Sequence, residues 1–256
     1  MIRTIFNQKG GVGKTSIAVN LAAAMAKSGR RVLLIDLDPQ ANSTTYVLGP
    51  RAVNLAHSIT DFFEQSLNFQ LFRASLDEFV VRSDFKNLFI IPASDALSDL
   101  QQKLELKHKI FRLSDGVAAL KPPHEFDEII IDTPPAMNFF SMSGILAADR
   151  VLLPFDCDVF SAEALHKVRL TIEEIRLDLK PELEIEGVII NQFQANTRLP
   201  ESLIAGVKAL NLPILQPYLS TSVAMRESHA AHRPLSFWRP KHKLADEFKN
   251  LAASLK

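Results

Sequence analysis

A glycine- and lysine-rich run near the N-terminus has the residue types needed to hold a phosphate group. Residues 9–15 read KGGVGKT and stand between an apolar segment and a helix-like segment. Glycines let the backbone turn tightly and aim its N–H groups at anionic oxygens, and the following helix adds the positive end of its dipole. Lys14 can reach the β- and γ-phosphates of a nucleotide, and the Thr15 hydroxyl can coordinate Mg²⁺. The predicted cofactor-binding set at this loop is Lys9, Gly10, Gly11, Val12, Gly13, Lys14, Thr15 and Ser16.

This run departs from the ordinary phosphate-loop pattern, G-x-x-x-x-G-K-S/T. Gln8 occupies the position of the first glycine, and Lys9 adds a second lysine at the front of the loop. The alternative is a glycine-rich strand-to-helix turn with two surface lysines. The strand-like segment before the run and the helix-like segment after it favour the phosphate site.

Carboxylates follow two further apolar segments. Asp36 and Asp38 come after residues 32–35 (VLLI), and Asp132 comes after residues 129–131 (III). A carboxylate at the end of a strand can hold Mg²⁺ through water or orient an attacking water molecule. Each acid alone also suits a turn before proline. In this order behind the phosphate loop, they indicate a magnesium–nucleotide site.

Strand-like and helix-like segments alternate along the chain. The predicted strands are residues 2–7, 31–36, 88–92, 128–132, 150–154, 185–191 and 212–216, and several are apolar almost throughout. Such strands are buried on both faces, as in a parallel sheet covered by helices. We therefore predict one domain over residues 1–256 with an α/β, doubly wound, mostly parallel sheet, and ligands at the carboxyl ends of its strands. Residues 40–86 are expected to contain helices.

Composition narrows the function classes. The 256 residues are 47% hydrophobic, with 29 basic and 29 acidic residues, so DNA binding requires a local basic patch. The single cysteine, Cys157, excludes an intramolecular disulfide and a cysteine-cluster metal site. No apolar run approaches the ~18 residues of a membrane span. Because the first predicted strand begins at residue 2, we expect neither a leader peptide nor a preceding helix-turn-helix module, and a cytoplasmic protein.

Three motifs together resemble the ParA/MinD family of P-loop ATPases with a deviant Walker A motif, in particular its Soj-like partition branch. They are KGGVGKT at residues 9–15, LLIDLDPQAN at 33–42 and DEIIIDTPP at 127–135; SVAMRES at 222–228 is a weaker match. The resemblance extends from residue 2 to about residue 235. It implies a P-loop NTPase fold and hydrolysis of ATP to ADP and phosphate with Mg²⁺.

The same resemblance implies that two protomers form a homodimer around ATP. Lys9 is then the family's signature lysine, which reaches the phosphates bound by the partner, as an arginine finger does. Lys9, Lys14 and Asp38 are thus the expected catalytic residues, with Asp38 orienting the hydrolytic water.

Metal and base contacts are implied in the same way. Thr15, Asp36 and Asp132 are expected at the metal, with Asp132 as the Walker B carboxylate. Asn191 matches the asparagine that reads adenine, because an amide can both donate to and accept from the base. A strand-terminal cap is the alternative role of Asn191.

Members of this branch bind DNA without sequence preference, and the C-terminal segment supplies basic charge for that role. From residue 226 to 256, seven basic residues stand against three acidic ones. Arg226, Arg239, Lys241 and Lys243 are the expected DNA contacts, and binding through them should depend steeply on salt. Thr221 stands where many relatives carry an arginine. The resemblance further implies association with the nucleoid and stimulation by a ParB-like or cargo-adaptor protein.

Two other classes of protein compete with this interpretation. A MinD-like ATPase that cycles on membranes needs an amphipathic C-terminal anchor, and four apolar residues do recur at helical spacing: Leu244, Phe248, Leu251 and Leu255. Nearby acids oppose anionic lipid, and the stripe equally suits a helix docked on the domain, so no membrane partner is expected. A metabolic synthetase or kinase would need further catalytic groups, and the scattered histidines form no ligand pattern. The cargo stays open: a plasmid, a chromosome origin or a protein assembly.

Overall fold

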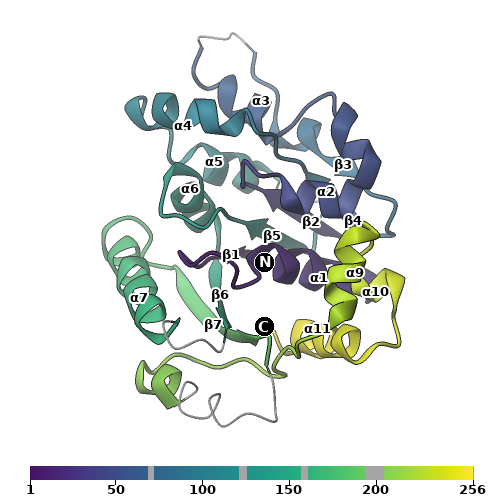
Figure 1. Cartoon of the computed structure of the whole chain (residues 1–256). Coiled ribbons are helices and arrows are strands. Elements are labelled where there is room, and N and C mark those ends of the chain that lie inside the picture. The colour runs from purple at the N-terminus through teal and green to yellow at the C-terminus, as the bar shows by residue number, and fades with distance from the viewer. Residues whose placement is uncertain (69–71, 121–125, 157–160, 194–204, 256) are drawn as a thin grey trace.

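The computed structural model describes residues 1–68, 72–120, 126–156, 161–193 and 205–255. Cys157 lies outside these described residues. Within them the chain forms one sheet with helices on both of its faces (Figure 1).

The sheet has seven strands in the order β3-β4-β2-β5-β1-β6-β7. Neighbouring strands run parallel, except that β3 pairs antiparallel with β4 at the edge. The predicted doubly wound, mostly parallel α/β fold is confirmed. The strands are β1 (Ile2–Ile5), β2 (Val32–Asp36), β3 (Val81–Arg82), β4 (Leu88–Ile91), β5 (Glu128–Asp132), β6 (Arg150–Asp156) and β7 (Glu184–Asn191).

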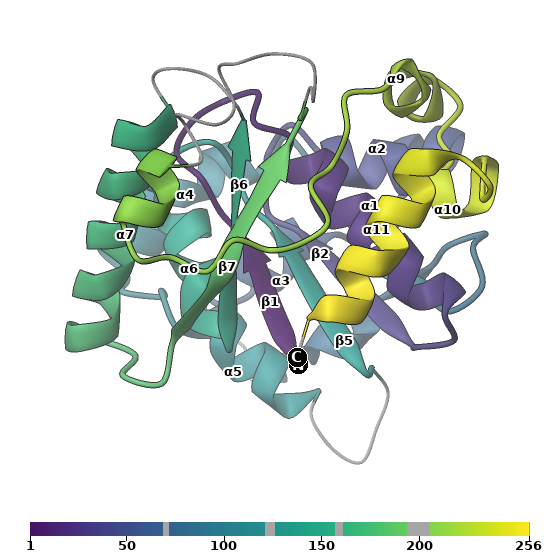
Figure 2. The same cartoon turned by 90° about the horizontal axis from the view of Figure 1, so that it is seen from below.

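Helices cover both faces, which explains why the central strands are apolar throughout. Successive strand residues point to opposite faces: Leu34 packs with the apolar side chains of α1 and α11, whereas Leu33 and Ile35 pack with those of α3 to α6. Figures 1 and 2 show α11 beside α1. The helices are α1 (Lys14–Lys27), α2 (Asn42–Leu48), η1 (Gly49–Asn54), α3 (Ile59–Glu64), η2 (Leu76–Phe79), α4 (Leu97–Leu106), α5 (Arg112–Ala119), α6 (Phe139–Ala147), α7 (Ser161–Asp178), α9 (Val223–Ala230), α10 (Leu235–Trp238) and α11 (Lys243–Ser254).

The predicted strand at residues 212–216 is wrong. This segment runs beside β7, but Ile214 makes only an isolated parallel bridge to Val188. The Val188 N–H donates to the Pro213 carbonyl at 2.8 Å, and the Leu215 N–H donates to the Val188 carbonyl at 2.9 Å. Prolines at positions 213 and 217 have no N–H group to donate, so the ladder cannot extend into a strand.

The apolar stripe near the C-terminus is part of the core. Leu244, Phe248, Leu251 and Leu255 are buried and share a cluster with the apolar side chains of α1. The stripe is therefore the docking face of α11, and the amphipathic anchor required by a membrane-cycling ATPase is not exposed there. Among the described residues, no helix combines the length and apolar character needed to cross a bilayer.

A buried arginine joins three strands of the sheet. Arg3 of β1 has a fully buried side chain that donates to Glu128 of β5 and, through Nε at 2.6 Å, to Glu186 of β7. Removing one partner of a buried ion pair leaves uncompensated charge in the interior, which is strongly destabilising. These contacts therefore make Arg3 a structural residue.

Arg3→Ala should lower the free energy of unfolding by about 2–3 kcal/mol, because Glu128 and Glu186 lose their buried partner and keep only the more exposed Arg30 and Arg150. Urea unfolding followed by circular dichroism measures this. Arg51→Ala is the matched control, since Arg51 pairs with Asp84 at the surface and such pairs contribute about 0–1 kcal/mol. Equal effects of the two variants would contradict a structural role for the Arg3 cluster.

Candidate functional site

The phosphate loop joins β1 to α1, and two of its glycines have left-handed backbone conformations. Gly11 has φ 77° and Gly13, directly before the helix, has φ 89°. The first helical hydrogen bond runs from the Ile17 N–H to the Gly13 carbonyl at 2.9 Å. The N–H groups of the first turn therefore have no helical acceptor and are available to an anion.

Side chains at the carboxyl end of β7 form hydrogen bonds with the backbone of this loop. The Asn191 amide donates to the Val12 carbonyl at 2.9 Å, and the Gln192 amide donates to the Gly11 carbonyl at 3.4 Å. A Cβ atom at Gly13 would lie 2.3 Å from Asn191 Nδ2. Asn191, predicted to read adenine, thus contacts the loop, and its role toward a base stays a prediction.

Both loop lysines are engaged by the chain itself. Lys14 is 7% exposed, and its Nζ donates to the Lys9 carbonyl at 3.0 Å. Burial lowers the pKa of Lys14, while the charges of Asp132 and Asp38 act in the opposite direction. Lys9 Nζ lies 3.1 and 3.0 Å from the two carboxylate oxygens of Asp156, at the end of β6. One ammonium group is therefore held by the loop backbone and the other by the end of β6.

Two buried carboxylates lie side by side next to the loop. Asp36 ends β2 and Asp132 ends β5, the two residues are paired in register, and both are 0% exposed. Asp36 accepts hydrogen bonds from the Thr44 N–H at 2.9 Å, the Thr44 hydroxyl at 2.8 Å and the Asp38 N–H at 3.1 Å. Burial, and then repulsion from Asp132, raise the pKa of Asp36 to about 8. Two negative charges are therefore unfavourable here in the ligand-free protein, and a bound cation would favour the ionised forms of both carboxylates.

Asp132 shows that the site fits Mg²⁺. Its Oδ2 accepts from the Ser43 hydroxyl at 2.8 Å, and burial raises its pKa to about 6. Its Oδ1 is buried without a hydrogen-bond partner among the described residues, an arrangement that a cation or its bound water would relieve. In the described part of the chain, no three His, Cys, Asp or Glu side chains form a metal cage. This donor set suits Mg²⁺, which keeps waters and phosphate oxygens as most of its ligands.

A cavity of about 440 Å³ opens beside the loop. Its lining includes Gly13 and Ser16 of the loop and first helical turn, Asn191 at the end of β7, and Thr221 and Met225. The cavity adjoins the phosphate loop, so a nucleotide held by the loop would have room there for its nucleoside part.

The predicted DNA contacts do not share one environment. Arg226 lines the cavity just described. Arg239 lies 3.1 Å from Glu227 and 4.1 Å from the centre of the Trp238 ring, and Lys243 lies 3.5 Å from Glu247.

Lys241 is exposed. Part of the segment's positive charge is therefore balanced locally by acidic residues, and the role of all four residues in DNA binding stays a prediction.

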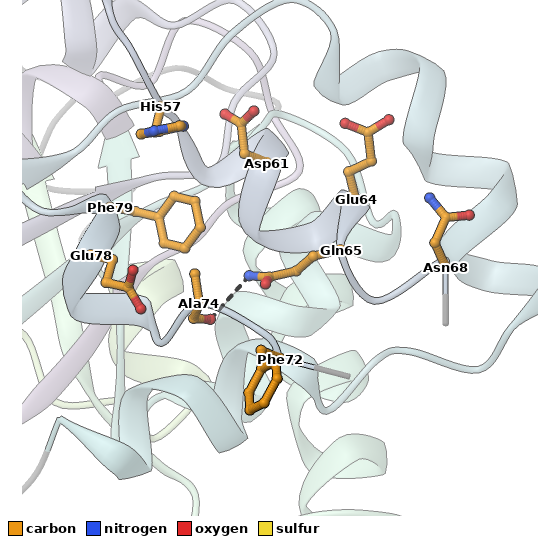
Figure 3. Close-up of a pocket in the computed structure, with 9 residues that line it drawn as sticks. All are labelled: His57, Asp61, Glu64, Gln65, Asn68, Phe72, Ala74, Glu78 and Phe79. Atoms are coloured by element: carbon orange, nitrogen blue, oxygen red, sulfur yellow. Dashed lines mark hydrogen bonds between the residues drawn. The ribbon is translucent and has the colours of Figure 1, made fainter. Parts of the chain in front are cut away.

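A larger cavity, of about 480 Å³, lies between α3 and η2 (Figure 3). None of the predicted site residues lines it. Two of its carboxylates serve as helix caps: Asp61 accepts from the Ser58 N–H at 2.7 Å, and Glu78 accepts from the Ser75 N–H at 2.9 Å. The acidic character of this cavity follows from capping.

Three residues in the nucleotide region were not anticipated from the sequence. Ser43 donates to Asp132, Asp156 holds Lys9, and His229 contacts Ser16. Ser43 directly follows the LLIDLDPQAN motif, and Asp156 lies just past a predicted strand, so the sequence offered a positional signal for both. His229 directly follows the weaker SVAMRES match at 222–228, but that match pointed to DNA contacts and not to the phosphate loop.

A parallel sheet whose first strand leads through a glycine-rich loop into a helix defines a P-loop NTPase. Residues 1–185 match a family model described as an AAA domain. The chain is 34% identical over 209 residues to the chromosome partitioning protein ParA of Caulobacter vibrioides, covering 81% of this chain and 75% of that protein. It is 30% identical over 254 residues to the sporulation initiation inhibitor protein Soj of Bacillus subtilis, covering 98% and 96%.

Solved structures agree with these relatives. Cobyrinic acid a,c-diamide synthase from Mycobacterium smegmatis, with bound ATP analogue and magnesium, superposes with a TM-score of 0.84 at 25% identity, over 98% of this chain and 92% of that one. A single-substitution variant of Cyanothece McdA in complex with ATP superposes with a TM-score of 0.83 at 26% identity, over 100% and 96%. The chain belongs to the ParA/MinD family of P-loop ATPases, as the motifs indicated, and it is an ATPase.

Gly13→Ala should destabilise the ligand-free protein by about 1–3 kcal/mol, because the new Cβ meets Asn191 and the backbone is left-handed. Thermal unfolding measures the loss. Gly10→Ala is the control, since a Cβ there meets nothing within 4 Å and its φ is not positive. A Gly13→Ala protein as stable as the Gly10→Ala protein would contradict the described clamp between β7 and the loop.

Proposed function

We propose that this ParA/Soj-like ATPase forms a homodimer with Mg-ATP, binds DNA without sequence preference, and positions a cargo over the nucleoid. The observation that carries the proposal is the two-lysine phosphate loop together with the buried, partly unpartnered carboxylate of Asp132. ATP and Mg²⁺ are the ligands that this donor set suits.

Each group of the site has a distinct task in this proposal. The loop backbone and Lys14 bind the phosphates, while Thr15 and Asp132 hold Mg²⁺. Asp36, which lies next to Asp132, completes the metal site. Mg²⁺, when bound, neutralises charge that develops on the β- and γ-phosphates. Asp38, 7% exposed at the carboxyl end of the sheet, orients the hydrolytic water. These roles are supported by the placement of the residues around one loop.

Lys9 acts on the phosphates held by the partner protomer. Its ion pair with Asp156 keeps the ammonium at the mouth of the loop, with the side chains of the two residues 25% and 19% exposed. Because both side chains are largely buried, this pair has to open, at a cost in free energy that the contact with the partner's phosphates offsets. An ammonium supplied by the second protomer stabilises transition-state charge, so hydrolysis requires the dimer.

DNA binding and cargo movement complete the cycle. The dimer carries two copies of the segment with Arg226, Arg239, Lys241 and Lys243, and it binds DNA phosphates by releasing counterions. A ParB-like or adaptor protein on the cargo then stimulates hydrolysis and releases the dimer from the nucleoid. In this cycle the protein is cytoplasmic and associates with the nucleoid in its ATP-bound form. The relatives named for chromosome partitioning support this assignment.

Asp38→Ala should bind ATP within about threefold of wild type, yet hydrolyse it at least about 100-fold more slowly, because the water loses its orienting carboxylate. Calorimetry and phosphate release measure the two effects. Lys14→Ala should lose nucleotide binding itself, and Asp246→Ala, which changes an exposed acid on α11, should alter neither quantity. Normal turnover by Asp38→Ala would remove Asp38 from the catalytic set, and tight ATP binding by Lys14→Ala would refute the site.

The double variant Lys241→Glu/Lys243→Glu should weaken binding of the ATP-loaded protein to duplex DNA. The slope of log affinity against log salt should fall by about 0.9 for each DNA phosphate that the variant no longer neutralises. Fluorescence anisotropy at several salt concentrations measures it, with light scattering to confirm the dimer. Lys103→Glu, at an exposed position on α4, is the control. An unchanged slope would place the DNA surface elsewhere.

A further inference from the structure

His229 of α9 reaches the helix that follows the phosphate loop. Its Nε2 lies 3.1 Å from the Ser16 hydroxyl oxygen, and its ring meets the Tyr46 ring edge-on with centres 4.3 Å apart. The imidazole also lines the cavity that Ser16 and Gly13 line from the loop side. The roles proposed above for the nucleotide site do not involve the contact between His229 and Ser16.

The surrounding hydrogen bonds fix α9 in place against α1 and α2. Asn20 of α1 donates to the Tyr46 hydroxyl at 3.1 Å, and that hydroxyl in turn bonds the Ser228 hydroxyl. The Leu235 N–H donates to the side-chain oxygen of Asn20 at 2.8 Å. This network positions Tyr46 and the backbone of α9, and the His229 ring packs against Tyr46 with its Nε2 at Ser16.

Ser16 lies where the phosphate loop opens into the cavity. Its N–H belongs to the first turn of α1, among the groups left without a helical acceptor. If the proposed nucleotide site is correct, the phosphate nearest to the nucleoside, the α-phosphate, lies against Ser16.

The direction of the Ser16–His229 hydrogen bond then matters. A hydroxyl has one hydrogen to donate, and the oxygens of a phosphate can only accept. If Ser16 donates to His229, it presents only lone pairs to the phosphate, which is repulsive. If His229 donates from Nε2, the Ser16 hydrogen is free for the phosphate oxygen. An anionic ligand therefore selects imidazole with its hydrogen on Nε2.

Burial acts in the same direction. It lowers the pKa of His229, so the neutral ring, with a single hydrogen, is favoured. When that hydrogen is on Nε2, the ring can donate it to the Ser16 hydroxyl oxygen.

We propose that His229 is a positioning residue that acts through Ser16, donating to its hydroxyl so that Ser16 donates to the α-phosphate of the bound nucleotide. ATP and ADP share this phosphate, so the contribution is equal for the two nucleotides and is separate from the chemistry at the γ-phosphate. Through the same bond, the occupied site contacts α9, which also carries Arg226.

The test compares His229→Leu with His229→Gln. Leucine retains bulk against Tyr46 but cannot donate, so the dissociation constants of Mg-ATP and Mg-ADP should both rise about fivefold, while kcat at saturating ATP stays within about twofold. Glutamine carries an N–H group at a reach similar to that of Nε2, and His229→Gln should restore both affinities to within about twofold of wild type. Equal losses in the two variants, or a loss confined to kcat, would overturn the proposal.

A double-mutant cycle separates action through Ser16 from a general packing effect. Ser16→Ala should lower the affinity for both Mg-ATP and Mg-ADP. Adding His229→Leu should lower neither affinity further, because His229 acts on the nucleotide only through the Ser16 hydroxyl. Additive losses would overturn the proposal. Failure of the nucleotide site itself gives a different result: wild type would not bind Mg-ATP, or Lys14→Ala would bind it normally.

Discussion

Two carboxylates that are buried next to each other determine how this protein is organised. Asp36 and Asp132 end neighbouring parallel strands in register and are inaccessible to solvent. Their burial and mutual repulsion are unfavourable in the ligand-free protein, and Oδ1 of Asp132 lacks a hydrogen-bond donor among the described residues. Such an arrangement is typical of a site whose stabilisation comes from its ligand. The loop amines and the hydroxyls of Ser43 and Thr44 are arranged around this charge.

The sheet order brings the remaining groups to the same edge. Because β1 lies between β5 and β6, the phosphate loop leaves the sheet between the Asp36–Asp132 pair and the ends of β6 and β7. Asp156 and Asn191, which end those two strands, each contact the loop, one through Lys9 and the other through the Val12 carbonyl. The ligand-free loop is thus already held by the strands beside it, which reduces the ordering that a nucleotide must impose.

Much of this was predictable. The unbroken apolar segments located six of the seven strands to within two residues at each end, because a strand that is buried on both faces has to be apolar at every position. The largest differences are at β1, which ends two residues earlier than predicted, and at β6, which extends two residues further, to Asp156. The short edge strand β3 was missed, since two residues are too few to show an alternating pattern. Residues 212–216 were assigned to a strand on their apolar residues, although Pro213 and Pro217 limit the hydrogen bonds that this segment can make. The Walker-type motifs located the loop and its acids, since phosphate binding requires those residue types at local spacing.

The sequence by itself determined the class of protein, the phosphate loop and the acids that follow it, because each depends on residues that are close along the chain. Only the tertiary structure decided which distant groups complete the site. Asp156 meets Lys9 across 147 positions, and His229 meets Ser16 across 213. The folded chain also placed the apolar stripe of α11 in the core and set Arg239 and Lys243 beside acidic partners. Contacts of this kind follow from strand order and helix packing, which local residue patterns do not encode.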